Sequence, residues 1–363
     1  MKILDLKKLS NKKIVNQAIK TLESGGLLIF PSETTYGAGV DATNTKAVEK
    51  LLTYKSRREG KPLSVAVVNK EMASKYVEIN DQAEKLYKNF LPGPITIVSK
   101  SKNNLASGVA SEFNTLGIRI PDYKLILDIL KIYKKPITAT SANASGKKRP
   151  YKITDIFNNI SDKQKNLIDL VLDAGELPHN QPSTVIDTTL SAPLTLRRRE
   201  IPNKSENLKL ESQNEQETKD IAGKLLLKHW EDLKKSRLII CLNGPLGAGK
   251  TIFAKGTAKF LKIEEEITSP TYTFINEYDF QRHGVKGKFY HLDLWKIDSQ
   301  ESFDLLAIPK LLESKQASLL VIEWWDQVAG FAKTRGIKPD LIVDFEEDNK
   351  NRILNIREGD MLY

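Results

Sequence analysis

The sequence contains a single cysteine, Cys241, among its 363 residues. A lone cysteine excludes an intramolecular disulfide, and with only four histidines present it argues against a zinc site built from Cys and His. No apolar run approaches the roughly 20 residues that span a bilayer, and the first residues are too polar for a signal peptide. We therefore expect a cytoplasmic protein in a reducing compartment, with no membrane partner.

The rest of the composition is that of an ordinary globular protein with an excess of basic residues. The chain is 40% hydrophobic and 28% charged, which is sufficient to bury a core. Its length exceeds that of one average domain and predicts two. The formal charge of +10 favours anionic partners such as nucleotides or RNA.

A polar stretch divides the sequence into two patterned regions. Residues 203–217 are rich in Asn, Ser, Gln, Glu and Lys and contain little that can pack. We therefore predict a first domain over residues 1–203, a linker over 204–217 and a second domain over 218–363.

The first domain alternates helix-like and strand-like segments. Apolar residues at helical spacing over 14–22 are followed by Gly25 and Gly26 and then by an apolar run over 27–30. Further short apolar runs predict strands at 64–68, 95–98 and 185–186. This alternation indicates an α/β domain without internal repeats.

A glycine-rich loop in the second domain is the strongest single motif. Residues 244–251 have the sequence Gly-Pro-Leu-Gly-Ala-Gly-Lys-Thr, which matches the P-loop pattern G-x-x-x-x-G-K-[ST]. The context also fits, because helix 220–234 and strand 237–242 are predicted before the loop and helix 250–261 after it. In such a loop the backbone N–H groups surround phosphates, the lysine contacts the β- and γ-phosphate oxygens and the hydroxyl reaches Mg²⁺. We therefore predict that ATP is bound by Gly247, Ala248, Gly249, Lys250 and Thr251.

A second metal-binding group is expected at the end of another strand. Residues 319–322 form an apolar run that ends in Glu323, the place where P-loop proteins usually hold a metal-binding carboxylate. Thr251 and Glu323 are therefore the predicted Mg²⁺ ligands. Trp324 and Trp325 follow; we assign Trp324 to the ATP site, to stack on adenine, and the other tryptophan to packing, although such pairs are more often core residues.

The second domain resembles the TsaE-type ATPase of tRNA threonylcarbamoylation, over residues 214–363. The resemblance is carried by the P-loop together with Ser-Pro-Thr at 269–271, Asn-Glu-Tyr at 276–278, His-Leu-Asp at 291–293 and Glu-Trp at 323–324. It implies that the Ser-Pro-Thr and His-x-Asp segments lie near the γ-phosphate, which makes Asp293 the candidate for ordering water or metal. Trp295-Lys296 stands where the family usually has Tyr-Arg, so a bidentate role of an arginine there is not expected.

The first domain carries seven motifs of small hydroxyl residues and isolated cations, at apparent strand ends and loops. They occupy residues 31–39, 55–63, 92–96, 117–121, 138–146, 183–187 and 196–199. Taken singly, each also fits a turn, a solvated face or a helix start. Together and in this order they resemble the YrdC-like family of threonylcarbamoyl-AMP synthases, over residues 5–201.

This second resemblance implies a reaction in which L-threonine, bicarbonate and ATP give threonylcarbamoyl-AMP and pyrophosphate. Adenylation needs cations that hold the triphosphate while charge develops on the leaving pyrophosphate. By family position, the ATP site comprises Lys55, Arg57, Lys61, Ser141, Asn143 and Arg197. Threonine would be bound by Arg119, as a carboxylate clamp, with Thr34 and Ser183. Whether Arg197, Arg198 or Arg199 faces ATP is left open, and no residue is an obvious nucleophile, so no covalent enzyme intermediate is expected.

Both resemblances together predict a YrdC-like twisted α/β domain followed by a small P-loop domain with a mainly parallel sheet. The implied function is bifunctional: one half makes the activated intermediate, and the other hydrolyses ATP to support its transfer to a tRNA adenosine by TsaD-like transferase and TsaB-like scaffold proteins. The alternative is a nucleotide-gated protein that binds RNA without chemistry. A third possibility, a small-molecule kinase, is disfavoured because no arginine-rich lid segment is evident.

Overall fold

The computed structural model describes residues 1–55, 63–144, 147–197, 207–313, 316–348 and 351–358, and the chain divides into two compact units. One unit comprises Met1–Thr189 with Pro193–Glu200, and the other Leu190–Ala192 with Ile201–Tyr363. Each unit has its own sheets and its own core, so each is described by itself.

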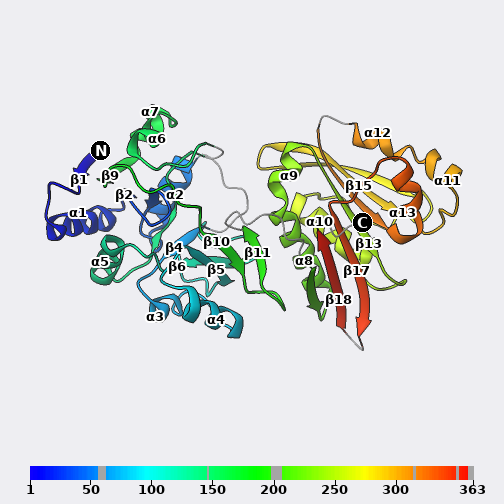
Figure 1. Ribbon diagram of the computed structural model, residues 1–363, viewed down its shortest axis with the longest axis horizontal. Coiled ribbons are helices and arrows are strands. Elements are labelled where there is room, and N and C mark those ends of the chain that lie inside the picture. The colour runs from blue at the N-terminus through cyan, green and yellow to red at the C-terminus, as the bar shows by residue number, and fades with distance from the viewer. Residues whose placement is uncertain (56–62, 145–146, 198–206, 314–315, 349–350, 359–363) are drawn as a thin grey trace. The chain divides into compact units, whose positions relative to one another are not determined.

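The first unit contains two sheets with helices around them (Figure 1). Its strands form a five-stranded sheet in the order β1-β9-β2-β3-β8 and a six-stranded sheet in the order β11-β10-β5-β6-β4-β7. The elements are β1 (Lys2–Asp5), α1 (Asn11–Glu23), β2 (Leu27–Phe30), β3 (Gly37–Gly39), α2 (Thr45–Lys55), β4 (Ser64–Ala66), α3 (Lys70–Ala73), α4 (Asp81–Phe90), β5 (Ile95–Lys100), β6 (Thr115–Arg119), α5 (Lys124–Tyr133), β7 (Ile137–Thr138), β8 (Thr140–Ser141), α6 (Ile153–Phe157), α7 (Asp162–Lys165), β9 (Ile168–Asp173), β10 (Thr184–Asp187) and β11 (Leu194–Arg197). The helix and strands predicted for this half are confirmed, with ends that differ by a few residues.

Strand β2 is buried on both of its faces and so joins two hydrophobic clusters. Because successive side chains of a strand point to opposite faces, Leu27 and Ile29 enter one cluster and Leu28 and Phe30 the other. The first cluster contains residues of both sheets, and the second is covered by α1 and α5. The loop after β2 is thereby fixed between two packed layers, which matters because it carries part of the candidate site.

The second unit is built on one seven-stranded sheet in the order β12-β18-β17-β13-β16-β15-β14. Its elements are β12 (Asn207–Ser212), α8 (Glu215–Lys228), α9 (Trp230–Lys235), β13 (Arg237–Asn243), α10 (Lys250–Leu261), β14 (Ile275–Arg282), β15 (Val285–Asp293), α11 (Gln300–Leu305), α12 (Ile308–Leu312), β16 (Ala317–Glu323), α13 (Trp325–Thr334), β17 (Leu341–Asp348) and β18 (Asn351–Glu358). One core cluster lies between the sheet and α11 to α13, with Cys241 of β13 and Val328 of α13 among its members. The predicted strand before the P-loop and the helix after it are confirmed, whereas the helix predicted over 220–234 is two helices that meet at His229.

The sheet of the second unit is parallel only at its centre. Strands β17, β13, β16 and β15 are parallel neighbours, while the pairs β12/β18, β18/β17 and β15/β14 are antiparallel. The prediction of a mainly parallel sheet therefore holds for the strands next to the P-loop and not for the edges. The edges differ because β14/β15 and β17/β18 are hairpins, whose short connections allow only antiparallel pairing.

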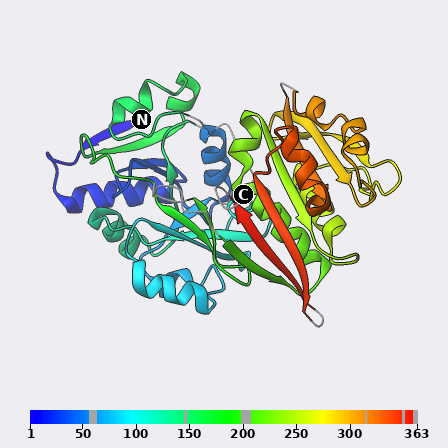
Figure 2. The ribbon, with the colours of Figure 1, turned by 45° about the vertical axis from the view of Figure 1, so that its right-hand side comes forward.

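Residues 207–212, which the sequence analysis placed in the linker, instead form the edge strand β12. The strand pairs with β18 along its whole length, and Figures 1 and 2 both show β12, β18 and β17 side by side. Only Leu210 and Ser212 of this strand are buried. The polar composition that resembled a linker belongs to the exposed face of an edge strand, where charged side chains also discourage pairing with other chains.

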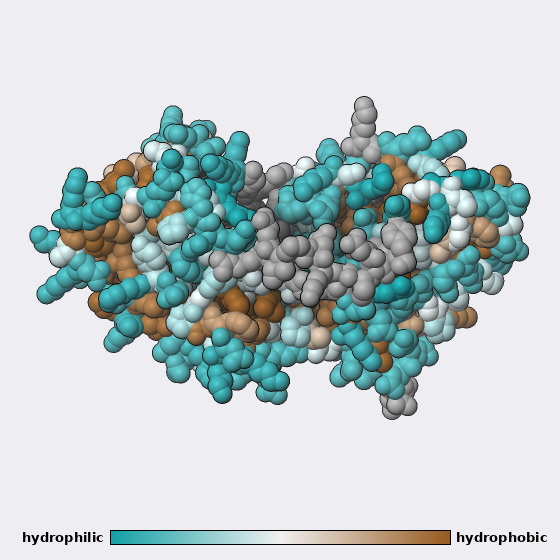
Figure 3. All heavy atoms as spheres, viewed as in Figure 1, coloured by the Kyte–Doolittle hydropathy of each residue, from teal (hydrophilic) through white to brown (hydrophobic). Residues whose placement is uncertain are grey.

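Hydrophilic side chains dominate the face of each unit that is drawn in Figure 3, with hydrophobic residues in smaller patches. Within the described ranges, no helix combines the length and the apolar character that crossing a membrane requires.

A pair of substitutions in β12 tests whether this strand belongs to the second unit. Leu210→Ala should lower the free energy of unfolding of that unit by about 2–5 kcal/mol, because Leu210 is fully buried. Lys209→Ala, at the neighbouring exposed position, should change it by less than about 0.5 kcal/mol. Urea unfolding followed by tryptophan fluorescence reports on the second unit, because that unit contains all four tryptophans, Trp230, Trp295, Trp324 and Trp325. Equal and small effects of both changes would mean that the segment is a linker after all.

Candidate functional site

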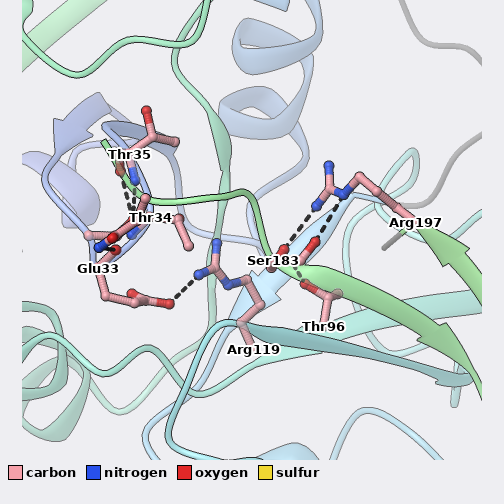
Figure 4. A network of polar contacts seen from close by, with 9 residues as sticks. Glu33, Thr34, Thr35, Thr96, Arg119, Ser183 and Arg197 are labelled. Atoms are coloured by element: carbon pink, nitrogen blue, oxygen red, sulfur yellow. Dashed lines mark hydrogen bonds and ion pairs between the residues drawn. The ribbon is translucent and has the colours of Figure 1, made fainter. Parts of the chain in front are cut away.

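Polar side chains from both sheets of the first unit meet around Arg119 (Figure 4). Glu33 and Thr34 lie in the loop between β2 and β3 of the five-stranded sheet. Arg119 is the last residue of β6, Ser183 precedes β10 and Arg197 is the last residue of β11, all in the six-stranded sheet. The structure therefore brings together the three residues predicted to bind threonine, and it adds Arg197 from the predicted ATP set.

Arg119 forms an ion pair with Glu33, a residue that the sequence analysis did not single out. Arg119 Nη2 donates to Glu33 Oε1 at 2.5 Å, and the two side chains are only 11% and 14% exposed. Within the part of the chain that the structure describes, Arg119 Nε and Glu33 Oε2 are buried and have no hydrogen-bond partner. Burying a charged group without a full set of hydrogen bonds is costly, so these two atoms are candidates for contact with a ligand.

On the other side of Arg119, Ser183 contacts Thr96 of β5 and a second arginine, Arg197 of β11 (Figure 4). Arg197 Nη2 donates to Ser183 Oγ at 2.9 Å and Arg197 Nε to Ser183 O at 3.0 Å, while Thr96 Oγ1 lies 3.1 Å from Ser183 Oγ. Burial of the guanidinium, with the positive charges of Arg119 and Arg149, lowers the pKa of Arg197 to about 10. The group is still a cation at neutral pH, which suits an anionic ligand. Arg198 and Arg199 lie outside the described residues.

Thr34 is buried in a tight arrangement of hydroxyl groups. Its Oγ1 lies 3.1 Å from Ser32 Oγ, which donates to Thr35 O at 2.7 Å. A serine that bonds the backbone two and three residues later stabilises a turn. The Pro-Ser-Glu-Thr-Thr motif therefore fixes the orientation of Glu33 and Thr34 toward Arg119.

A second polar group forms where α2 meets β8. Lys55 Nζ donates to Ser141 O at 2.7 Å and to Asn143 O at 2.6 Å, and burial lowers the pKa of Lys55 to about 8. At neutral pH the ammonium is mostly charged, and two of its three N–H groups serve these carbonyls. Three residues predicted to bind ATP are thus neighbours, although Ser141 and Asn143 contact Lys55 through their main-chain carbonyls. Arg57 and Lys61, also predicted for this site, lie outside the described residues.

The P-loop of the second unit has the backbone that its glycines permit. Gly244 and Gly249 have φ angles of +130° and +107°, a region that residues with a Cβ rarely adopt. Lys250 Nζ donates to Gly244 O and to Pro245 O, both at 2.7 Å, and lies 3.9 Å from the centre of the Trp324 ring. Trp325 is buried in the core cluster, so one tryptophan packs as expected. Trp324 lies against the P-loop lysine, and its contact with adenine remains a prediction.

The two predicted Mg²⁺ ligands contact one another. Thr251 Oγ1 donates to Glu323 Oε1 at 2.9 Å, and His291 Nε2 lies 2.8 Å from the same oxygen. Glu323 and His291 are both buried, on the adjacent parallel strands β16 and β15. His291 was part of a quoted motif but had no assigned role; here it fixes the position of the Glu323 carboxylate.

Asp293 lies opposite Glu323 in the register of β15 and β16. Its side chain accepts hydrogen bonds from hydroxyl groups of the Ser-Pro-Thr segment. Ser269 Oγ donates to Asp293 Oδ2 at 2.6 Å and Thr271 Oγ1 at 3.2 Å, while Asp293 Oδ1 is buried without a partner in the described part of the chain. These oxygen donors are of the kind that Mg²⁺ prefers, and phosphate oxygens and water usually complete its shell. Across the described residues, no three His, Cys, Asp or Glu side chains form a metal-binding group of their own.

The structure also places an arginine beside the P-loop that sequence reasoning missed. Two other arginines of this unit have partners elsewhere: Arg282 is buried against the Phe260 ring and donates to Phe260 O, and Arg335 pairs with Asp304. Arg352 of β18 instead lies beside Gly249: its Cδ and Nε are 2.9 and 3.0 Å from the position that a Cβ on Gly249 would occupy. Only the order of strands in the sheet reveals this proximity.

Two family profiles match the chain, one in each half. The profile of the Sua5, YciO and YrdC proteins, described as "Telomere recombination", matches residues 20–199. The profile described as "Threonylcarbamoyl adenosine biosynthesis protein TsaE" matches residues 212–354.

Relatives of the first half include named synthases. A putative threonylcarbamoyl-AMP synthase of Methanocaldococcus jannaschii is 36% identical over 202 residues, which are 56% of this chain and 93% of the relative. The threonylcarbamoyl-AMP synthase of Pyrococcus abyssi is 32% identical over 177 residues, 48% of this chain and 51% of that protein.

A solved structure supports the fold. The crystal structure of P. abyssi Sua5 complexed with L-threonine aligns over 95% of this chain and all of that chain, with a TM-score of 0.52 and 21% identity. Through its first half the chain therefore belongs to the family of Sua5, YciO and YrdC proteins, and its second half is a TsaE domain.

Proposed function

We propose that the chain is a bifunctional enzyme of tRNA threonylcarbamoyladenosine biosynthesis. Its first unit converts L-threonine, bicarbonate and ATP to threonylcarbamoyl-AMP and pyrophosphate, and its second unit is a P-loop ATPase. The observation that carries the proposal is the succession of a synthase-family domain and a TsaE domain in one chain. The buried grouping of Arg119, Thr34 and Ser183 favours an enzyme over an RNA-binding protein without chemistry, which would not need it.

In the first unit, two cations flank Ser183 and divide the site into two halves. Arg119 holds the threonine carboxylate, with Thr34 and Ser183 lining that half of the site. Arg197 and Lys55 hold the triphosphate, helped by Ser141 and Asn143 and by Arg57 and Lys61. The cations stabilise charge on the leaving pyrophosphate, and this charge stabilisation together with orientation suffices for adenylyl transfer.

In the second unit, backbone N–H groups of residues 247–251 and the Lys250 ammonium hold the phosphates of ATP. Thr251 and Glu323 would hold Mg²⁺, which would neutralise negative charge on the phosphates. His291 orients Glu323 through the 2.8 Å contact, and Asp293 orders the Ser-Pro-Thr segment beside the γ-phosphate. Hydrolysis supports transfer of the threonylcarbamoyl group to tRNA by TsaD-like and TsaB-like partner proteins.

Substitution of the two site arginines should separate the two substrates of the synthase. Arg119→Ala should raise the KM for threonine and Arg197→Ala mainly the KM for ATP, each by about 10-fold or more, because hydrogen bonds to charged groups contribute about 1.5–3 kcal/mol. Lys124→Ala, at an exposed position of the same unit, is the control. Pyrophosphate release and threonylcarbamoyl-AMP formation are measured while one substrate is varied. If both arginine variants raise the same constant alone, the assignment of roles is wrong.

Substitution of the metal-site residues should affect only the second activity. Thr251→Ala and Glu323→Ala should reduce Mg²⁺-dependent ATP hydrolysis by at least about 100-fold, since a metal contact can contribute several kcal/mol of charge stabilisation. Threonylcarbamoyl-AMP synthesis by the same variants should stay within about twofold of the wild type. Thr334→Ala, which removes a hydroxyl at the end of α13, serves as the matched control. Loss of synthesis in both folded variants would show instead that the two sites are coupled.

The ATPase should be slow in the isolated chain and accelerated by TsaD-like and TsaB-like proteins. P-loop hydrolysis typically gains about 10³–10⁵ in rate from an arginine that contacts the transferring phosphoryl group. Arg352 makes the test specific, because it lies beside Gly249 in the same unit. ATP turnover is measured with and without the partners, in the wild type and in Arg352→Ala. A fast basal rate that the partners leave unchanged and that Arg352→Ala abolishes would mean that the site is complete within one chain.

A further inference from the structure

The Glu33–Arg119 ion pair leaves one nitrogen of the cation and one oxygen of the anion buried without a hydrogen-bond partner in the described structure. The contact uses Arg119 Nη2 and Glu33 Oε1 only. Arg119 Nε and Glu33 Oε2 are both shielded from solvent and, among the described residues, neither has a hydrogen-bond partner. Guanidinium has five N–H donors and a carboxylate has about four acceptor positions, so each group retains the capacity for a further contact.

An unpartnered N–H of a cation beside an unpartnered oxygen of an anion matches the charges of an α-amino acid. The carboxylate and the ammonium of such a molecule are separated by a single carbon atom. An amino acid whose carboxylate accepts from Arg119 therefore brings its ammonium within reach of Glu33, because the two protein groups are themselves in contact (Figure 4). A ligand with a carboxylate and no hydrogen-bond donor on its α-carbon would leave the Glu33 oxygen without a partner, at the full cost of desolvation.

We propose that Glu33 binds the α-ammonium of threonine and accepts the proton that this group must lose before it is carbamoylated. The inference rests on the proposed synthase function and adds a catalytic residue to it. The Glu33 carboxylate takes one proton from the ammonium, and the amine nitrogen then forms a bond to the carbon of bicarbonate. The bond between that carbon and its hydroxyl breaks, and the departing hydroxide takes a second nitrogen-bound proton and leaves as water. The product is the threonine carbamate, and Glu33 returns its proton to solvent.

The position of Glu33 supports a role in proton transfer rather than packing alone. The carboxylate is held by one strong hydrogen bond from Arg119, and its loop is fixed by the Ser32 hydroxyl, which donates to Thr35 O at 2.7 Å. A group that is oriented in this way loses little freedom when substrate binds. Ser183 and the second cation, Arg197, lie on the far side of Arg119, where the carbamate oxygen would meet ATP.

The test uses the full chain and the variant Glu33→Gln. Glutamine keeps an oxygen that accepts from Arg119 but has no negative charge and cannot take the proton. Glu84→Gln is the matched control, since Glu84 is a half-exposed carboxylate of the same unit that pairs with Lys70. Circular dichroism and thermal unfolding first establish that each variant is folded. Calorimetry then gives the Kd of L-threonine and of its α-hydroxy analogue, in which a hydroxyl replaces the ammonium, and rapid quench gives the rate of threonylcarbamoyl-AMP formation at saturating threonine.

We expect Glu33→Gln to weaken threonine binding by about 10-fold or more and to leave the Kd of the α-hydroxy analogue within about twofold. The rate at saturating threonine should fall by about 10²–10⁴-fold, the range for loss of a general base. Glu84→Gln should match the wild type throughout. Equal weakening of both ligands would mean that Glu33 acts only through Arg119, and tighter threonine binding would mean that Glu33 competes with the substrate carboxylate; either result overturns the proposal. An unchanged rate at saturating threonine also overturns it, whereas a wild-type chain that makes no threonylcarbamoyl-AMP contradicts the synthase function itself.

Discussion

Charged side chains that are withdrawn from water must find partners, and this requirement fixes the functional groups of both units. In the first unit it holds Glu33 against Arg119, each supplied by a different sheet. In the second unit it holds Glu323 between the Thr251 hydroxyl and the His291 ring. Because an unpaired buried charge is far more costly than a paired one, a small displacement of either carboxylate is strongly opposed. The same contacts therefore hold both candidate sites in one arrangement.

The sheet of the second unit shows how backbone geometry gathers side chains that are distant in sequence. Strands β13, β16 and β15 are parallel, so their carboxyl ends lie at one edge. That edge carries the P-loop after β13, Glu323 at the end of β16 and Asp293 at the end of β15. The antiparallel hairpins at the margins of the sheet do not disturb this arrangement. One of them delivers Arg352 to the opposite side of the loop from Glu323, since β18 lies beyond β17 in the strand order.

Sequence reasoning found the features whose chemistry is contiguous in the chain and those that a family motif marks. The P-loop is a single segment with its own strand and helix, so its residues and their environment were predictable together. Thr34, Arg119 and Ser183 were identified through the order of family motifs, and their meeting in space is a property of the two sheets. Glu33 lay within a quoted motif but was passed over, because its partner is 86 residues away and nothing local marks the pair. Strand β12 was missed because an exposed edge strand has the composition of a linker, with Leu210 as its one fully buried apolar residue.

The lone cysteine, Cys241, can serve as a probe of the second unit because of its position in the fold. Cys241 is completely buried in β13, the strand that leads into the P-loop, and burial raises its pKa well above the ordinary value. A thiol in that state reacts with alkylating reagents only when the surrounding core opens. The rate of modification therefore measures how often the second unit opens. Opening of the first unit does not affect it, because that unit has no thiol. Nucleotides that bind the P-loop should slow this labelling in proportion to the stability they add, so the unmodified protein already contains a reporter of occupancy at one of its two ATP sites.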